Sequence, residues 1–188
     1  MDDPDPNVLH FPDAAGWESW LAAQHAAQKE AWLRIAKRHA GIACLTIMEA
    51  LDVALCYGWI DGQRKAFDDV SYLQRYSRRR PGSSWSKVNV AKIEALLAAG
   101  RMQPPGLAEV AAAKADGRWD AAYEPQRSAA VPPDLAQALS ASPPAHAAFE
   151  RLGRSQRYAV ILPLLKARTQ ETRARALARA VARLTAQP

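Results

Sequence analysis

The chain has 188 residues, of which 49% are hydrophobic and 23% are charged, and its formal net charge is +6. This length and composition predict a soluble globular protein of one domain, or of one domain with a small helical appendage. No apolar run approaches the length of a membrane span, so no transmembrane segment is expected. The positive net charge permits contact with nucleic acid, anionic lipid or acidic ligands, but it does not show which of them is bound.

The first residues, MDDPDPNVLHF, are acidic and rich in proline. They lack the basic and apolar regions of a signal peptide, and we therefore expect a cytoplasmic protein. The two cysteines, Cys44 and Cys56, form neither a CxxC pair nor a zinc spacing, and Cys56 is expected to be a buried thiol. The histidines, at positions 10, 25, 39 and 146, are far apart, so we expect no metal site and no cofactor.

The N-terminal part predicts a strand, a helix and a second strand. Residues 8–11 form a short apolar run, and Asp13 is a suitable N-cap for the helix that follows. One face of that helix carries residues at helical spacing, namely Trp17, Trp20, Leu21 and Gln24. Residues 31–37, AWLRIAK, alternate in the way that predicts a strand.

The clearest helix signal begins at Thr46, which forms a T-x-x-E capping box with Glu49. Its apolar stripe ends at Gly58, a residue type suited to the position after a helix. The spacing then changes to an alternation that predicts two strands, over residues 60–66 and 70–77. We expect their turn near residues 67–69, and a turn at Asp61-Gly62 is the alternative.

Residues 78–82, RRRPG, predict a basic loop that stops the second strand. A helix follows, and Pro104-Pro105 begins another one. The apolar residues of that second helix, Leu107, Val110 and Ala111, are expected to face inward.

The C-terminal part shows helical signals only. Ser155 and Thr169 are expected to be N-caps of helices. Pro163 falls inside a helical pattern, where it should kink or end the helix because it has no backbone N–H.

Together these patterns predict an α+β fold with a small antiparallel β-sheet packed with helices, followed by an all-helical C-terminal segment. The expected organisation is an α+β domain over residues 1–120, a connecting arm over residues 121–133 and a helical segment over residues 134–188.

Residues 56–89 combine aromatic, basic and amide side chains in the way that binding surfaces do. We predict a cleft there with apolar walls, hydrogen-bonding amides and charged groups for a negative or carbonyl group. Its residues would be Trp59, Asp61, Gln63, Lys65, Tyr72, Gln74, Arg75, Trp85, Lys87 and Asn89. The alternative is that Trp59, Tyr72 and Trp85 simply fill the core between sheet and helices.

Other motifs are weaker. The carboxylates Asp61, Asp68 and Asp69 lie near the rings but suit ion pairs and turns as well as acid–base chemistry. The serines of residues 83–86 follow three arginines and could hold an anion, or simply cap a helix. The chain has no P-loop, no G-x-G-x-x-G and no G-x-S-x-G motif.

Four stretches of the chain resemble the YdeI/OmpD-associated family, also called bacteriocin-protection proteins. They are EALDVALCYGWIDGQRK, YLQRYSRRRPGSSWSKVN, GLAEVAAAKADGRWDAAY and RYAVILPLLKARTQETRARAL, and the resemblance extends from about Trp17 to Leu184. It implies protection against antimicrobial peptides or small toxic compounds, and an association with an outer-membrane protein. It implies no reaction, cofactor or catalytic residue.

The leading hypothesis is a non-catalytic protection protein that binds or sequesters a small amphipathic toxic compound, with a small molecule or a peptide as its ligand. A second hypothesis is nucleic-acid binding by two basic clusters, with Tyr72, Tyr76 and Trp85 stacking on bases. The first cluster consists of Arg64, Lys65, Arg75, Arg78, Arg79, Arg80 and Lys87, and the second consists of Lys166, Arg168, Arg173, Arg175, Arg179 and Arg183. A third is an enzyme acting on a small carbonyl or amide compound, with Asp61, Tyr72 or Lys65 in the chemistry.

Overall fold

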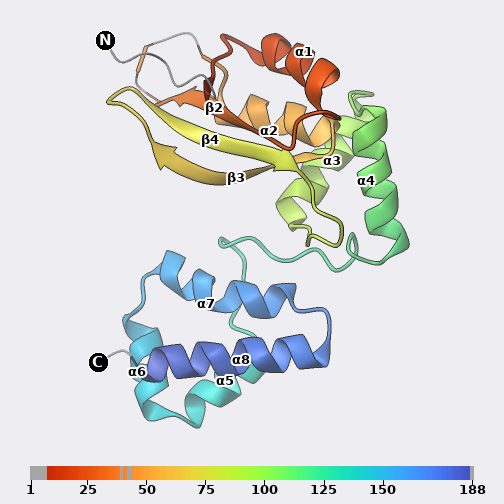
Figure 1. Cartoon of the computed structure of the whole chain (residues 1–188). Helices are drawn as coiled ribbons and strands as arrows, with labels where there is room; N and C mark the ends of the chain where they lie inside the picture. Colours follow the sequence, from red (N-terminus) through yellow and green to blue (C-terminus); the bar gives the residue numbers. More distant parts are fainter. Residues whose placement is uncertain (1–7, 39, 42–43, 187–188) are drawn as a thin grey trace. The chain divides into compact units, whose positions relative to one another are not determined.

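The computed structural model describes residues 8–38, 40–41 and 44–186, and the chain divides into two compact units. Unit 1 consists of Met1–Ser83 and Asn89–Asp120, and unit 2 consists of Ser84–Val88 and Ala121–Pro188. Unit 1 combines a four-stranded sheet with helices, whereas the C-terminal region is helical (Figure 1). The predicted α+β class with a helical C-terminal segment is confirmed.

The sheet of unit 1 has the strand order β1-β2-β4-β3. The strands are β1 (Val8–Leu9), β2 (Glu30–Ala36), β3 (Trp59–Ala66) and β4 (Ser71–Arg78). The three long strands are antiparallel neighbours, and the short β1 joins β2 in parallel, so the sheet is mixed. The predicted turn between β3 and β4 is confirmed, whereas Asp61 and Gly62 lie at a bulge within β3.

Helices α1 (Ala14–Gln24) and α2 (Ile47–Cys56) lie on the same side of the sheet (Figure 1). Trp17 of α1 is fully buried, and its ring centroid lies 6.2 Å from that of Trp59 and 5.8 Å from that of Tyr76. Its Nε1 donates a hydrogen bond of 3.1 Å to the backbone oxygen of Ala50 in α2. The tryptophan therefore joins both helices to β3 and β4, as a large ring with one polar handle is suited to do.

The predicted signals at the ends of α1 and α2 are confirmed. The carboxylate of Asp13 accepts a hydrogen bond of 3.0 Å from the backbone N–H of Gly16. Thr46 and Glu49 form the expected reciprocal capping box at the start of α2. Gly58 follows α2 with φ of +73°, a left-handed conformation that favours glycine and turns the chain into β3.

Helices α3 (Lys87–Ala98) and α4 (Pro104–Ala115) follow the sheet. The inward face predicted for α4 is wrong for Leu107, which is 43% exposed, and for Ala111, which is also exposed. The buried residues are Gly106, Val110 and Ala113. α4 turns this face inward because a backbone-to-backbone contact at Gly106 sets its orientation against α2.

Four helices make up most of unit 2: α5 (Pro133–Ser140), α6 (Pro143–Arg151), α7 (Arg154–Lys166) and α8 (Gln170–Thr185). They share a core centred on Leu135, Phe149, Leu164 and Leu184. Thr169 caps α8 as predicted, but Gly153 rather than Ser155 is the N-cap of α7, because the helix begins at Arg154. Pro163 stands inside α7, which continues for another three residues to Lys166.

The segment Ser84–Val88 belongs to unit 2 through backbone pairing. The backbone N–H of Tyr123 donates to the oxygen of Trp85 at 2.9 Å, and that of Lys87 donates to the oxygen of Tyr123 at 3.0 Å. Within the part of the chain that the structure describes, no helix is long and apolar enough to cross a membrane.

Candidate functional site

The residues predicted as one ligand site occupy separate places. Trp59 is fully buried, and its ring meets those of Trp17 and Trp20 edge-on, with centroids 6.2 and 5.9 Å apart. Its Nε1 has no hydrogen-bond partner among the described residues. Trp59 is thus a core side chain of unit 1.

Tyr72, Gln74 and Asp61 lie on the helix-covered face of the sheet. Gln74 is buried, and its amide nitrogen donates a hydrogen bond of 3.0 Å to the backbone oxygen of Gly62, which holds the bulge of β3. Tyr72 lies under the guanidinium of Arg64, at 4.3 Å from ring centroid to Cζ. Gln74 therefore has a structural contact, whereas Tyr72 remains half-exposed.

Lys65 lies on the opposite face, where its ammonium stands 4.2 Å from the ring centroid of Trp32. Asp61 keeps contact with solvent, yet the pKa of its carboxyl is raised because neighbouring protein atoms displace water from it. Gln63 is exposed in the bulge. Since Lys65 points away from the face of Asp61 and Tyr72, the three residues of the enzyme hypothesis do not converge.

The remaining predicted residues, Trp85, Lys87 and Asn89, come after β4 in the sequence. Trp85 and Lys87 belong to unit 2, where Trp85 is buried and Lys87 forms an ion pair of 2.5 Å with Glu124. Asn89, half-buried in α3, belongs to unit 1. The hydroxyl of Ser83 accepts a hydrogen bond of 3.4 Å from Arg79.

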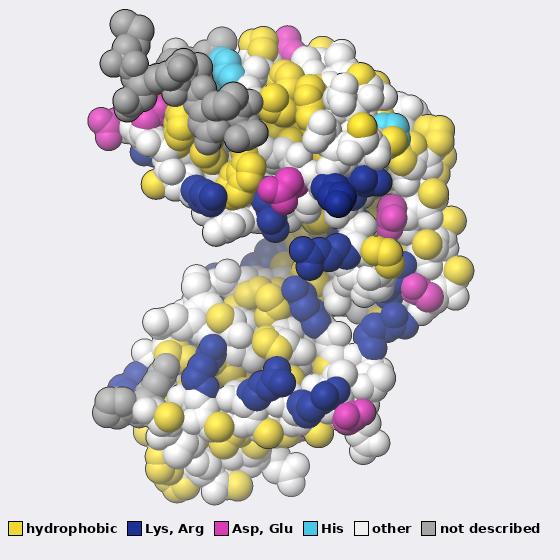
Figure 2. Space-filling model, viewed as in Figure 1, with side chains coloured by type: hydrophobic (Ala, Val, Ile, Leu, Met, Phe, Trp, Pro, Cys, Tyr) yellow, Lys and Arg dark blue, Asp and Glu magenta, His cyan; other side chains and the backbone are white. Residues whose placement is uncertain are grey.

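Arg75 lines an opening of unit 1, which we call the arginine cavity. The cavity has a volume of about 780 Å³ and is lined by five cationic side chains and two carboxylates. The cationic residues are Lys29, Arg75, Arg78, Arg79 and Arg80, and the acidic ones are Glu30 and Glu109. Figure 2 shows basic side chains gathered on unit 1, with acidic ones between them.

The start of β2, the end of β4, the loop after β4 and the first turn of α4 all lie at this cavity, so their charged side chains meet there. β2 begins at Glu30, and β4 ends at Arg78 beside it, because the two strands are antiparallel. The loop after β4 is held by a hydrogen bond of 3.1 Å from the backbone N–H of Arg79 to the oxygen of Gly58. The first turn of α4 supplies Pro105 and closes the wall next to Gly58.

The donors of the cavity are only partly used by the protein. Nη1 of Arg75 forms an ion pair of 3.3 Å with Glu30, but its Nε is buried without a hydrogen-bond partner among the described residues. Burial, with smaller contributions from Glu18 and Cys56, raises the pKa of the lining residue Tyr57. Its phenol thus stays protonated and can donate a hydrogen bond. A guanidinium N–H and a phenol O–H at one hollow suit an anionic ligand group.

Cys56, which precedes the lining residue Tyr57, is a buried thiol. Burial raises the pKa of Cys56 to about 11, so its thiol is protonated at neutral pH and is a poor nucleophile. Across residues 8–38, 40–41 and 44–186, no three His, Cys, Asp or Glu side chains are grouped to hold a metal ion. The histidine at position 39, which was considered from the sequence as a metal ligand, lies outside the described residues.

A second opening of unit 1, of about 820 Å³, includes Tyr72 and Arg64. Apolar residues such as Leu45, Ile47 and Met48 line it as well, and Met48 is 57% exposed. Tyr72 and Arg75 therefore belong to different openings, although only two residues separate them in the sequence.

The prediction omitted Lys29 and Glu30, which are far from β4 in the sequence, and it also omitted Tyr57, although that residue lies within residues 56–89. The run of residues 78–80 was the available signal, since it marks a concentration of positive charge. Only the pairing of β2 with β4 shows which residues stand opposite that run.

The fold and the site describe a two-unit protein. One unit is an α+β unit with an arginine-lined cavity, and the other is a small helical unit in the same chain. The chain belongs to the family described as "Domain of unknown function (DUF8412)", which matches residues 9–109. Residues 128–187 match the family described as "Bacteriocin-protection, YdeI or OmpD-Associated". That match confirms the predicted family, whose name suggests bacteriocin protection in general. It covers the helical C-terminal part, whereas the resemblance was predicted from about Trp17 onward and residues 9–109 match the other family.

No curated protein and no solved structure was found to match the chain.

Proposed function

We propose that the protein is a non-catalytic protection protein that binds a small amphipathic compound in the arginine cavity. The observation that carries the proposal is the cavity itself, with five cationic side chains and two carboxylates around about 780 Å³. Pockets for small molecules commonly have volumes of about 300–1,000 Å³. The general reference to bacteriocin protection in the family name supports a protective role.

The lining sets the chemistry of the compound. The excess of cations attracts an anionic group and repels a cationic peptide. The guanidinium of Arg75 lines the cavity and, beside its ion pair of 3.3 Å with Glu30, supplies N–H donors to that group. The apolar surfaces of Tyr57, Pro105 and Ala108 offer contacts to an apolar body. We therefore expect an amphipathic anion, with a carboxylate, sulfonate or phosphate attached to a hydrophobic group.

The other hypotheses receive less support from the structure. Base stacking requires exposed rings, but Tyr76 is fully buried and Trp85 is 1% exposed. The enzyme hypothesis requires Asp61, Tyr72 and Lys65 near one substrate, whereas the alternation of β3 puts Lys65 on the far face of the sheet.

Anilinonaphthalene sulfonate, an amphipathic anion whose fluorescence rises in apolar surroundings, tests the proposal by titration. Its uncharged parent, phenylnaphthylamine, is the matched ligand control. We expect the sulfonate to bind saturably and phenylnaphthylamine to bind about tenfold more weakly. The reason is that only the sulfonate can accept a charge-assisted hydrogen bond, which is worth roughly 1.5–3 kcal/mol.

The variant Arg75→Gln removes one charge from the cavity and should weaken sulfonate binding about tenfold. The variant Arg127→Gln removes the same charge from an exposed residue of unit 2 and should leave the affinity unchanged. Equal affinities for Arg75→Gln and the unaltered protein would show that the arginine cavity is not the binding site.

A further inference from the structure

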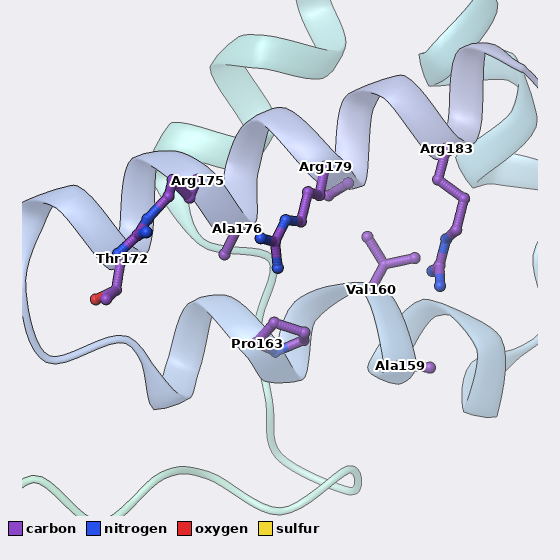
Figure 3. A pocket seen from close by; sticks show the side chains of 9 residues that line it. Ala159, Val160, Pro163, Thr172, Arg175, Ala176, Arg179 and Arg183 are labelled. Atoms are coloured by element: carbon purple, nitrogen blue, oxygen red, sulfur yellow. The ribbon is translucent and has the colours of Figure 1, made fainter.

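A second concave surface lies wholly within unit 2 and is independent of the arginine cavity. Helices α7 and α8 pack side by side and leave a groove of about 420 Å³ between their outer faces (Figure 3). Its apolar residues are short, with Ala159 and Pro163 on α7 and Ala176 and Ala180 on α8. Because these side chains are small, the groove has room for larger apolar side chains from elsewhere.

One edge of the groove is a row of arginines, Arg175, Arg179 and Arg183, at every fourth position of α8. Four residues of α-helix rise about 6 Å, so the charges lie along a line of roughly 12 Å. Figure 3 shows the three side chains extending from α8 on the side that faces α7. The row is therefore a linear array of charge along the groove, and it differs in form from the clustered charge of the arginine cavity.

The protein itself hardly neutralises this row. Arg175 forms an ion pair of 3.5 Å with the exposed Glu171, and such surface pairs contribute little. Arg179 and Arg183 have no ion pair or hydrogen bond with any residue that the structure describes. By contrast, Arg173 on the same helix is bound by both carboxylate oxygens of Asp134, at 2.7 and 2.9 Å.

We propose that this groove is a docking site for an acidic amphipathic α-helix of a partner protein. A third helix fits against two packed helices, and its apolar side chains would occupy the space above the alanines. Acidic residues at every fourth position of that helix would have the same spacing of about 6 Å as the arginines. A lipid surface would contact the arginines but could not fill the concave floor, and a small anion would occupy only part of the row.

The probe is a synthetic, fluorescently labelled helical peptide that carries glutamate at every fourth position beside a strip of leucines. Binding to the full chain is followed by fluorescence anisotropy. We expect saturable binding that weakens with salt, and a loss of about tenfold or more for Arg179→Glu and for Arg183→Glu, because charge reversal places like charges together. Arg127→Glu changes the net charge equally outside the groove and should cause less than about a threefold loss.

Three further measurements separate a docked helix from simple charge attraction. Ala159→Trp fills the floor without altering any charge, and it should abolish peptide binding. A peptide of the same composition with a central proline cannot form the helix and should not bind. Equal loss of affinity in Arg127→Glu, or unchanged binding in Ala159→Trp, would overturn the proposal. So would binding of phosphatidylglycerol vesicles or duplex DNA that depends on Arg179 when the helical peptide does not bind.

Discussion

The contact between α4 and α2 depends on a glycine, and its replacement by alanine should destabilise unit 1. A Cβ on Gly106 would lie 2.2 Å from the backbone oxygen of Cys56 and 2.8 Å from its carbonyl carbon. Carbon atoms in contact normally lie about 3.5–4.0 Å apart, so the methyl group lacks roughly 1 Å of room. Backbone atoms cannot rotate aside as a side chain can, so α4 has to move away from α2.

The magnitude follows from two opposed effects. Overpacking costs about 1–3 kcal/mol, and a contact with rigid backbone belongs at the upper end of that range. Alanine recovers about 1 kcal/mol of helix propensity relative to glycine. The expected net loss is about 2 kcal/mol, which corresponds to a fall in Tm of roughly 4–8 °C for a chain of this size.

Gly16→Ala is a matched control, because Gly16 is also the third residue of a helix in unit 1. Its Cβ would come within 3.2 Å of the side chain of Phe11, which can adjust. Urea unfolding followed by tryptophan fluorescence reports mainly on unit 1, since Trp85 is the one tryptophan in unit 2. Equal free energies of unfolding for the Gly106→Ala and Gly16→Ala variants would refute the close approach of α4 to α2.

Three further predictions concern single side chains. Hydrogen bonds from Thr46 lower the pKa of Glu49 below its ordinary value of 4.5, so their stabilisation is present above that pH and is lost as the pH falls through the lowered pKa. Thr46→Ala should therefore cost about 1 kcal/mol in urea unfolding at neutral pH and less in acid; a cost that does not vary with pH would contradict this. A thiol reagent at neutral pH should label half-buried Cys44 before Cys56, whose pKa is about 11 because of burial; mass spectrometry identifies the order, and first labelling of Cys56 would be the contrary result. Phe149→Ala in the core of unit 2 should cost about 3–5 kcal/mol by circular dichroism, and a loss below about 1 kcal/mol would show that the ring is not packed there.

Local signals in the sequence predicted those features that nearby residues determine. The capping box of Thr46 and Glu49 needs only a spacing of three, and Gly58 ends α2 because of its own conformational freedom. The turn between β3 and β4 follows from alternation on either side of it. Each of these features is decided within about one turn of helix or a few residues of strand.

Features that depend on contacts between distant segments were predicted less well. Leu107 was expected to face inward because it is apolar, but the tight approach at Gly106 turns it to solvent. Trp59 and Tyr72 share one sheet face, yet Trp59 lies in the core while Tyr72 reaches an opening. Whether an aromatic side chain packs in the core or reaches an opening depends on which helix covers it. The periodicity of the sequence does not show where a helix will lie.

By itself, the sequence determined the α+β class, the helical C-terminal segment, the ends of α1 and α2, and the YdeI/OmpD-associated match of the C-terminal part. Its run of arginines after β4 indicated where positive charge would concentrate. Only the tertiary structure decided that Lys29, Glu30 and Tyr57 join those arginines around one hollow. The reason is physical: antiparallel pairing of β2 with β4 and the docking of α4 onto Gly58 bring together residues that are distant along the chain.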